Sequence, residues 1–189
     1  MTLYKTTAKF FILIAILILC TASKKNKPVE KPKHIAGLLK EVAPFLVNKK
    51  GEKLEKSDIQ NIDYVLYYWS AHWCGPCKKF TPKLVELYKN NGGGEKFEVV
   101  FVSSDRSKDK MLNYMQKANM EWPAIEYGQK KNTSIRKFGS GYIPHLMLTN
   151  KNGDIIGMGR GMLDELKKRL STSKENAKDK KIKKDLGDF

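Results

Sequence analysis

Residues 64–78 decide the fold and read YVLYYWSAHWCGPCK. Residues 64–70 carry no charge and are rich in aromatic and β-branched side chains, a composition typical of a central strand buried on both faces. Cys74 and Cys77 follow in a Cys-x-x-Cys spacing, and from residue 75 to residue 89 the apolar residues recur at helical spacing. The stretch therefore predicts a buried strand followed by a helix, with the cysteine pair at their junction.

The sequence on either side predicts further strands and helices. Downstream we expect a strand at 97–103, helices at 107–119 and 132–138, a hairpin of strands at 145–149 and 154–157, and a last helix at 164–170. Upstream we expect a hairpin or loop arm at 43–47 and 51–54, and a helical turn that begins at 57–59. Strands that alternate with helices indicate a parallel start to the sheet, and the hairpin adds an antiparallel edge. The expected class is α/β, with a central mixed sheet flanked by helices.

The first 22 residues have the layout of a secretory signal. Lys5 and Lys9 precede an apolar run at 10–19, and small residues follow it. The run is shorter than the ~20 residues that a membrane span needs, so we expect cleavage after Ala22 and export to the periplasm or the extracellular space. A retained membrane anchor and lipid attachment at Cys20 are the alternatives.

The remaining chain divides by composition into a linker, one domain and a tail. Residues 23–33 are rich in lysine and proline and predict a linker, residues 34–170 form the domain, and residues 171–189 are a charged tail that we expect to be disordered. The net charge of +16 comes to a large extent from lysines at the two ends. Solvated tails explain this charge, so we expect no nucleic-acid partner, and we expect a monomer.

The cysteine count excludes two kinds of site. Of the three cysteines, Cys20 leaves with the signal, and the mature chain keeps only the pair Cys74 and Cys77. A structural disulfide scaffold uses several pairs, and zinc needs four ligands, whereas this chain offers one pair and three scattered histidines. We therefore expect no metal and no cofactor other than a redox-active disulfide between the two cysteines.

The position of the pair predicts thiol chemistry. A cysteine at the start of a helix is stabilised as a thiolate by unpaired backbone N–H groups and by the helix dipole, which suits Cys74 as the nucleophile. Cys77 lies one turn further in and suits the resolving role. Pro76 falls in the first turn, where a missing N–H costs nothing.

The run WCGPCK at 73–78 resembles the thioredoxin active-site motif, with Trp73 and Gly75 as parts of it. The neighbouring residues 68–74 and 80–84, the run FEVVFVSSDR at 97–106, and Trp122 resemble the tryparedoxin and nucleoredoxin branch. This resemblance covers residues 34–170 and implies a thioredoxin-like fold. It also implies an enzyme that acts on protein disulfides and takes electrons from a thiol donor.

The resemblance leaves the direction of the reaction open. Gly75-Pro76 between the cysteines resembles the reducing members, so we expect a reductase, with an isomerase or an oxidase as alternatives. A non-catalytic peptide-binding module with the same fold is a further alternative.

The resemblance also assigns residues outside the motif. Pro144 matches a cis proline that lies against the cysteine pair, and Ile143 before it then offers backbone groups to an extended substrate. The family places a buried aspartate six residues before the first cysteine, but this chain has Tyr68 there. Asp105 and His72 are the candidate proton carriers in its place.

Overall fold

The computed structural model describes residues 37–55 and 62–185. The expected signal, the linker, the start of the domain at residue 34 and the helical turn at 57–59 lie outside these residues. Within residues 37–55 and 62–185, no helix is long and apolar enough to cross a membrane.

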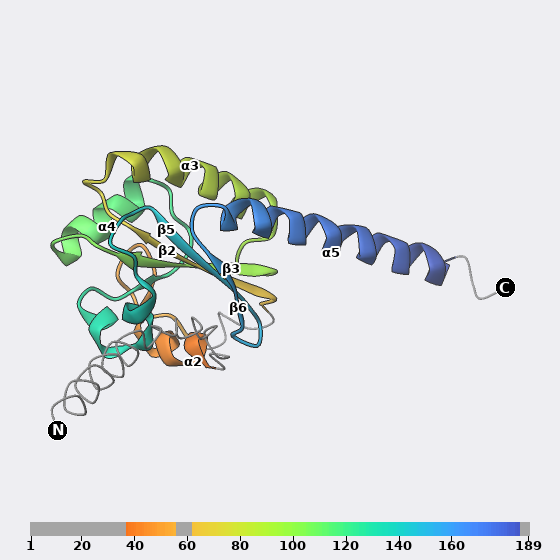
Figure 1. Ribbon diagram of the computed structural model, residues 1–189, viewed down its shortest axis with the longest axis horizontal. Coiled ribbons are helices and arrows are strands. Elements are labelled where there is room, and N and C mark those ends of the chain that lie inside the picture. The colour runs from red at the N-terminus through yellow and green to blue at the C-terminus, as the bar shows by residue number, and fades with distance from the viewer. Residues whose placement is uncertain (1–36, 56–61, 186–189) are drawn as a thin grey trace, which may run out of the picture. The chain divides into compact units, whose positions relative to one another are not determined.

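A single mixed sheet forms the centre of the described structure (Figure 1). Its six strands are β1 (Leu46–Val47), β2 (Tyr64–Ser70), β3 (Phe97–Ser103), β4 (Ala124–Ile125), β5 (His145–Asn150) and β6 (Ile155–Met158). They lie in the order β1-β4-β3-β2-β5-β6. The β2–β3 and β3–β4 pairs are parallel, and the β1–β4, β2–β5 and β5–β6 pairs are antiparallel. The parallel start and the antiparallel hairpin edge are thus as predicted.

The alternating side chains of β2 and β3 contribute to two cores, one on each face of the sheet. On one face Leu66 and Tyr68 pack with the apolar sides of α3 (Gly75–Asn90), α4 (Lys108–Lys117) and α5 (Met162–Asp185). On the other face Val65 and Tyr67 pack against α2 (Leu38–Val42) and against Ile135 of the 3₁₀ helix η4 (Ser134–Phe138). Figure 1 shows α3 and α4 on one side of the sheet and α2 on the other. Burial on both faces explains why residues 64–70 carry no charge.

Several short elements differ from the sequence-based expectation. The expected helix at 132–138 is a pair of 3₁₀ helices, η3 (Gln129–Asn132) and η4. The expected arm at 43–47 and 51–54 contains the 3₁₀ helix η1 (Ala43–Phe45) and the two-residue strand β1, which bridges antiparallel to Lys53. Helix α2 and strand β4 were not predicted. Elements of two to five residues are too short for a periodic pattern to reveal them.

Helix α5 continues well past its predicted end at Leu170 and reaches Asp185. The tail up to that residue is therefore helical, where we expected disorder from residue 171. The hydroxyls of Ser171, Thr172 and Ser173 donate to the carbonyls of Lys168 and Arg169 within the helix. The lysine, glutamate and alanine residues that follow have good helix propensity, which explains the continuation.

Candidate active site

The cysteine pair lies at the start of α3, directly after β2. Cys74 and Cys77 form a disulfide with a sulfur–sulfur distance of 2.12 Å and a Cα–Cα distance of 5.2 Å. Cys74 is the N-cap residue of α3, and its sulfur accepts a hydrogen bond from the backbone N–H of Cys77 at 3.1 Å. Cys74 is 5% exposed, whereas Cys77 is fully buried. The outer sulfur is therefore the one that an incoming thiol or disulfide can reach, and the inner sulfur lies behind it.

The segment before β5 lies against the outer cysteine. The peptide bond between Ile143 and Pro144 is cis, as the resemblance implied, and the Cys74 sulfur lies 3.7 Å from the Ile143 carbonyl oxygen. Each of the two residues in this contact follows an exposed aromatic residue: Trp73, 51% exposed, precedes Cys74, and Tyr142, 70% exposed, precedes Ile143. The outer sulfur thus lies between two segments that each present an exposed ring.

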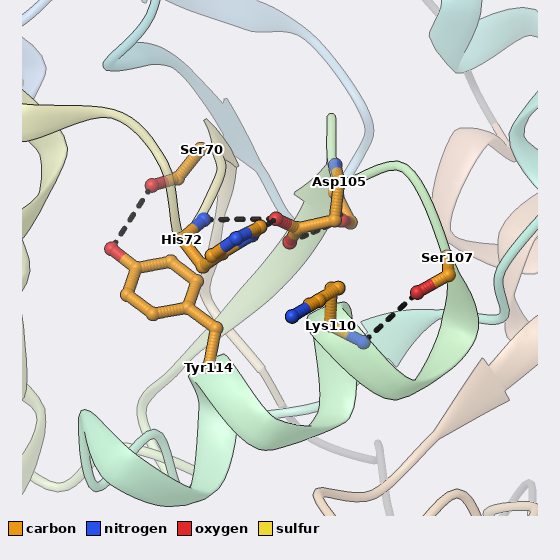
Figure 2. Close-up of polar contacts among 7 residues, drawn as sticks. Ser70, His72, Asp105, Ser107, Lys110 and Tyr114 are labelled. Atoms are coloured by element: carbon orange, nitrogen blue, oxygen red, sulfur yellow. Dashed lines mark hydrogen bonds and ion pairs between the residues drawn. The ribbon is translucent and has the colours of Figure 1, made fainter.

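His72 and Asp105, two separate candidates in the sequence, form a hydrogen-bonded pair (Figure 2). The Asp105 oxygen Oδ1 accepts from the backbone N–H of His72 at 2.9 Å and from its Nδ1 at 2.6 Å, and Oδ2 accepts from the Ser103 hydroxyl at 2.8 Å. The Asp105 side chain is fully buried and that of His72 is 36% exposed. Because a carboxylate only accepts, the Nδ1 of His72 carries the hydrogen of this contact. The pair ties the segment before Cys74 to the end of β3.

A chain of buried hydroxyl groups occupies the space behind Cys77. The Thr81 hydroxyl donates to the Cys77 carbonyl at 2.9 Å and lies 2.8 Å from the hydroxyls of both Tyr68 and Tyr114. With its one hydrogen used, Thr81 accepts from both tyrosines, and Tyr114 then accepts from Ser70 at 3.3 Å (Figure 2). Burial raises the pKa of Tyr68 above its usual range, so its hydroxyl stays neutral. Hydroxyl groups therefore replace the buried carboxylate that the resemblance led us to look for at position 68.

His145, immediately after Pro144, packs against two aromatic rings and bonds to a backbone carbonyl. The centroid of its ring lies 5.2 Å from that of Trp69 and 6.3 Å from that of Tyr142. Its Nε2 lies 3.1 Å from the Phe138 carbonyl, to which it donates, and burial lowers its pKa. A neutral histidine in this position braces the proline segment from behind.

The described residues offer no grouping of three or more histidine, cysteine or acidic side chains that would hold a metal ion. The two sulfurs of this site can exchange with a second thiol or disulfide.

Sequence comparison relates the chain to known families. A family model described as thioredoxin-like matches residues 61–155. The probable nucleoredoxin 1 of Arabidopsis thaliana is 39% identical over 114 residues, which are 59% of this chain and 19% of that protein. Nucleoredoxin of Bos taurus is 37% identical over 118 residues, 61% of this chain and 26% of that protein. Tryparedoxin of Trypanosoma brucei brucei is 36% identical over 118 residues, with 61% and 79% covered. The chain thus matches about a quarter or less of these two nucleoredoxins but most of the tryparedoxin.

Solved structures of the same kind resemble the described fold. Thioredoxin from Wuchereria bancrofti superposes with a TM-score of 0.58 at 30% identity, covering 69% of this chain and 97% of that chain. Tryparedoxin from Trypanosoma brucei superposes with a TM-score of 0.54 at 35% identity, covering 68% and 92%.

Proposed function

Since this chain belongs to the thioredoxin-like family of oxidoreductases, we propose that it reduces disulfides of protein substrates through a dithiol–disulfide cycle of Cys74 and Cys77. The observation that carries this proposal is the bonded pair at the start of α3, with the sulfur of Cys74 at the N-cap. In the reduced state, the backbone N–H of Cys77 and the helix dipole stabilise negative charge on that sulfur.

The proposed cycle transfers two electrons in two exchanges. The Cys74 thiolate attacks one sulfur of a substrate disulfide, forms a mixed disulfide and releases the other substrate sulfur as a thiolate, which takes up a proton. Cys77 then loses its proton, and its thiolate attacks the Cys74 sulfur. This step closes the Cys74–Cys77 disulfide and releases the second substrate sulfur as a thiol. A thiol donor restores the dithiol by the same exchange in reverse and becomes oxidised.

The segment at Ile143 and Pro144 supports the substrate part of this proposal. The Ile143 carbonyl is within 3.7 Å of the reactive sulfur, where an extended peptide can pair with the main chain. The exposed rings of Trp73 and Tyr142 then contact residues on either side of the substrate cysteine. The solved tryparedoxin II complexed with glutathionylspermidine suggests a low-molecular-mass thiol as the donor class for this chain.

Insulin reduction in the presence of dithiothreitol tests the proposal. We expect the wild type to accelerate precipitation of the insulin B chain and Cys74→Ser to lose this acceleration. We expect Cys77→Ser to accumulate a mixed disulfide, because the second exchange is missing. Wild-type activity in Cys74→Ser would refute the catalytic proposal and favour a peptide-binding module.

The reduction potential of the cysteine pair tests the direction of the cycle. A reductase with Gly75-Pro76 between its cysteines is expected to have a reduction potential near about −270 mV, against about −120 mV for a strong oxidant. Equilibration of the pair with glutathione buffers gives the value. A potential near the oxidant limit would overturn the reducing direction.

We propose export as the location, on the strength of residues 1–22 alone. A reporter fused after residue 22 should leave the cytoplasm, and the same reporter without residues 1–22 should stay there. Retention of both fusions inside the cell would refute export.

A further inference from the structure

A hollow lies between α3 and α4 and is lined in part by Lys78, which directly follows Cys77. It has a volume of about 460 Å³, and His72, Lys78, Thr81, Lys110, Tyr114 and Lys117 are among the residues that line it. A volume of this size is typical of small-ligand sites in proteins. The first two exchange steps need only the sulfurs and the proline segment, so this hollow has no role in the cycle described above.

The charged residues that line the hollow are all positive. Three lysines line the hollow and no acidic residue does. Within residues 37–55 and 62–185, none of the three lysines forms an ion pair, whereas Lys49 and Lys53 pair with Glu121 and Glu126 elsewhere on the surface. Three uncompensated ammonium groups around one concave surface produce a positive potential that attracts anions.

The buried carboxylate of Asp105, which is bonded to His72 of the lining, does not neutralise this charge by direct pairing. The Asp105 side chain is fully buried, and its oxygens accept from His72 and Ser103. In Figure 2 the Lys110 side chain extends from α4 towards His72 and Tyr114 and has no dashed contact to Asp105. The ammonium of Lys110 is therefore free to meet a ligand.

The floor of the hollow connects it to the reactive pair. Thr81 lines it and donates to the Cys77 carbonyl, and Lys78 directly follows Cys77 in α3. The hydroxyl hydrogens of Thr81 and Tyr114 are used within their own network, so these two residues contribute no charge to the floor. The attraction for an anion thus comes from the lysines at the rim.

We propose that this hollow binds a carboxylate-bearing part of the disulfide partner, and that Lys110 and Lys117 determine specificity for acidic partners. The inference rests on the proposed function, because it concerns which disulfides reach Cys74. The carboxylate belongs either to acidic residues beside the substrate cysteine or to a small acidic disulfide, and both sources present the same group to the lysines.

The test compares charged and neutral disulfides on the reduced full-length chain. Stopped-flow rates are measured with 5,5′-dithiobis(2-nitrobenzoate), which carries two carboxylates, and with neutral 4,4′-dithiodipyridine. Two disulfide-bridged peptides, one with glutamate and one with glutamine around the cysteines, represent protein substrates. The variants are Lys110→Glu/Lys117→Glu and the milder Lys110→Gln/Lys117→Gln. The matched control Lys151→Glu/Lys168→Glu changes the net charge equally at two exposed positions outside the hollow.

At low ionic strength we expect the charge reversal in the hollow to slow the acidic disulfides by about five- to tenfold. The matched control should slow them less than about twofold, and the difference should shrink at high salt. The neutral disulfides should react at the wild-type rate in all variants, which also shows that the variants are folded. A loss confined to the small acidic disulfide identifies a small partner, and a loss confined to the glutamate peptide identifies a protein segment.

Equal losses in the hollow and control variants, or no loss in either, would overturn the inference while leaving the cycle intact. If the reduced wild type fails to react even with the neutral disulfides, the proposed function itself fails. The glutamine variants decide the matter if the glutamate variants do not fold.

Discussion

Two buried carboxyl groups lie at opposite ends of β3, and their surroundings differ. Asp105, just past the end near the disulfide, is 8% exposed and accepts from three donors spread over both oxygens. Glu98, near the start of the strand, is 4% exposed and has both its donors, the Tyr88 hydroxyl and the Val99 N–H, on Oε1. Burial raises the pKa of Glu98 to about 7. The two carboxyl groups are thus buried to a similar extent, but Asp105 has donors on both oxygens and Glu98 on only one.

The largest effect is expected when Asp105 is removed. Asp105→Ala leaves the His72 N–H and the Ser103 hydroxyl without their acceptor in a buried place, and should lower the free energy of unfolding by about 3 kcal/mol. Because the same carboxylate holds the segment before Cys74, insulin reduction should also slow. Urea denaturation and the insulin assay measure the two effects. A variant as stable as the wild type would show that Asp105 does not tie β3 to that segment.

Glu98→Gln should act in the opposite direction and depend on pH. The folded protein holds the Glu98 proton between about pH 4.5 and 7, where the unfolded chain has lost it, so the free energy of unfolding falls as the pH rises through this window. The shift of 4.5 to about 7 corresponds to roughly 3 kcal/mol. The glutamine keeps an acceptor for Tyr88, so the variant should be more stable than the wild type by about 2–3 kcal/mol at pH 8.

At pH 4 this difference should vanish, because both states of the wild type are then protonated. Urea denaturation of the oxidised proteins at the two pH values provides the measurement. Glu121→Gln, at a half-exposed ion pair with Lys49, is the control and should change stability by less than about 1 kcal/mol. An equal gain at both pH values would mean that ionisation of Glu98 is not the cause.

A smaller effect is expected at His72. The backbone N–H of this residue also donates to Asp105, so His72→Ala removes only the ring contact and should cost about 1 kcal/mol. Comparing this variant with Asp105→Ala in a double-mutant cycle measures the coupling of the pair. Additive losses would indicate that the ring contributes nothing through Asp105.

The smallest effect is expected at Tyr88. Tyr88→Phe removes one of the two donors to Glu98 and should raise the pKa of that carboxyl further, because a charged carboxyl gains more from a hydrogen bond than a neutral one. The expected cost is about 1 kcal/mol at pH 8 and less at pH 4. Titration of the Glu98 carboxyl by NMR provides the check, and an unchanged pKa would contradict it.

The sequence was most informative where physical constraints act on long or distinctive stretches. The uncharged run at 64–70 predicted β2, because a strand covered on both faces admits few charges. The WCGPCK run and its neighbours predicted the thioredoxin-like fold and the likeness to nucleoredoxin and tryparedoxin, and the comparisons confirm both.

The sequence was least informative about contacts between distant residues. His72 and Asp105 were predicted as two separate candidate proton carriers, and no periodic pattern relates two residues that far apart. Both follow neighbouring parallel strands, whose carboxyl ends meet at one edge of the sheet, and this rule is the signal that could have paired them. Thr81 and Tyr114 were missed because a hydroxyl within an amphipathic helix shows in sequence no sign of its partner.

The far half of α5 has a practical consequence for handling the protein. The buried side chains of this helix end with Leu170, and the side chains described from 171 to 178 all face water. Lys174 alone among them makes a described hydrogen bond to another element, at Asn91. A fluorophore or an affinity handle placed on these turns would report on, or immobilise, the molecule without disturbing its interior.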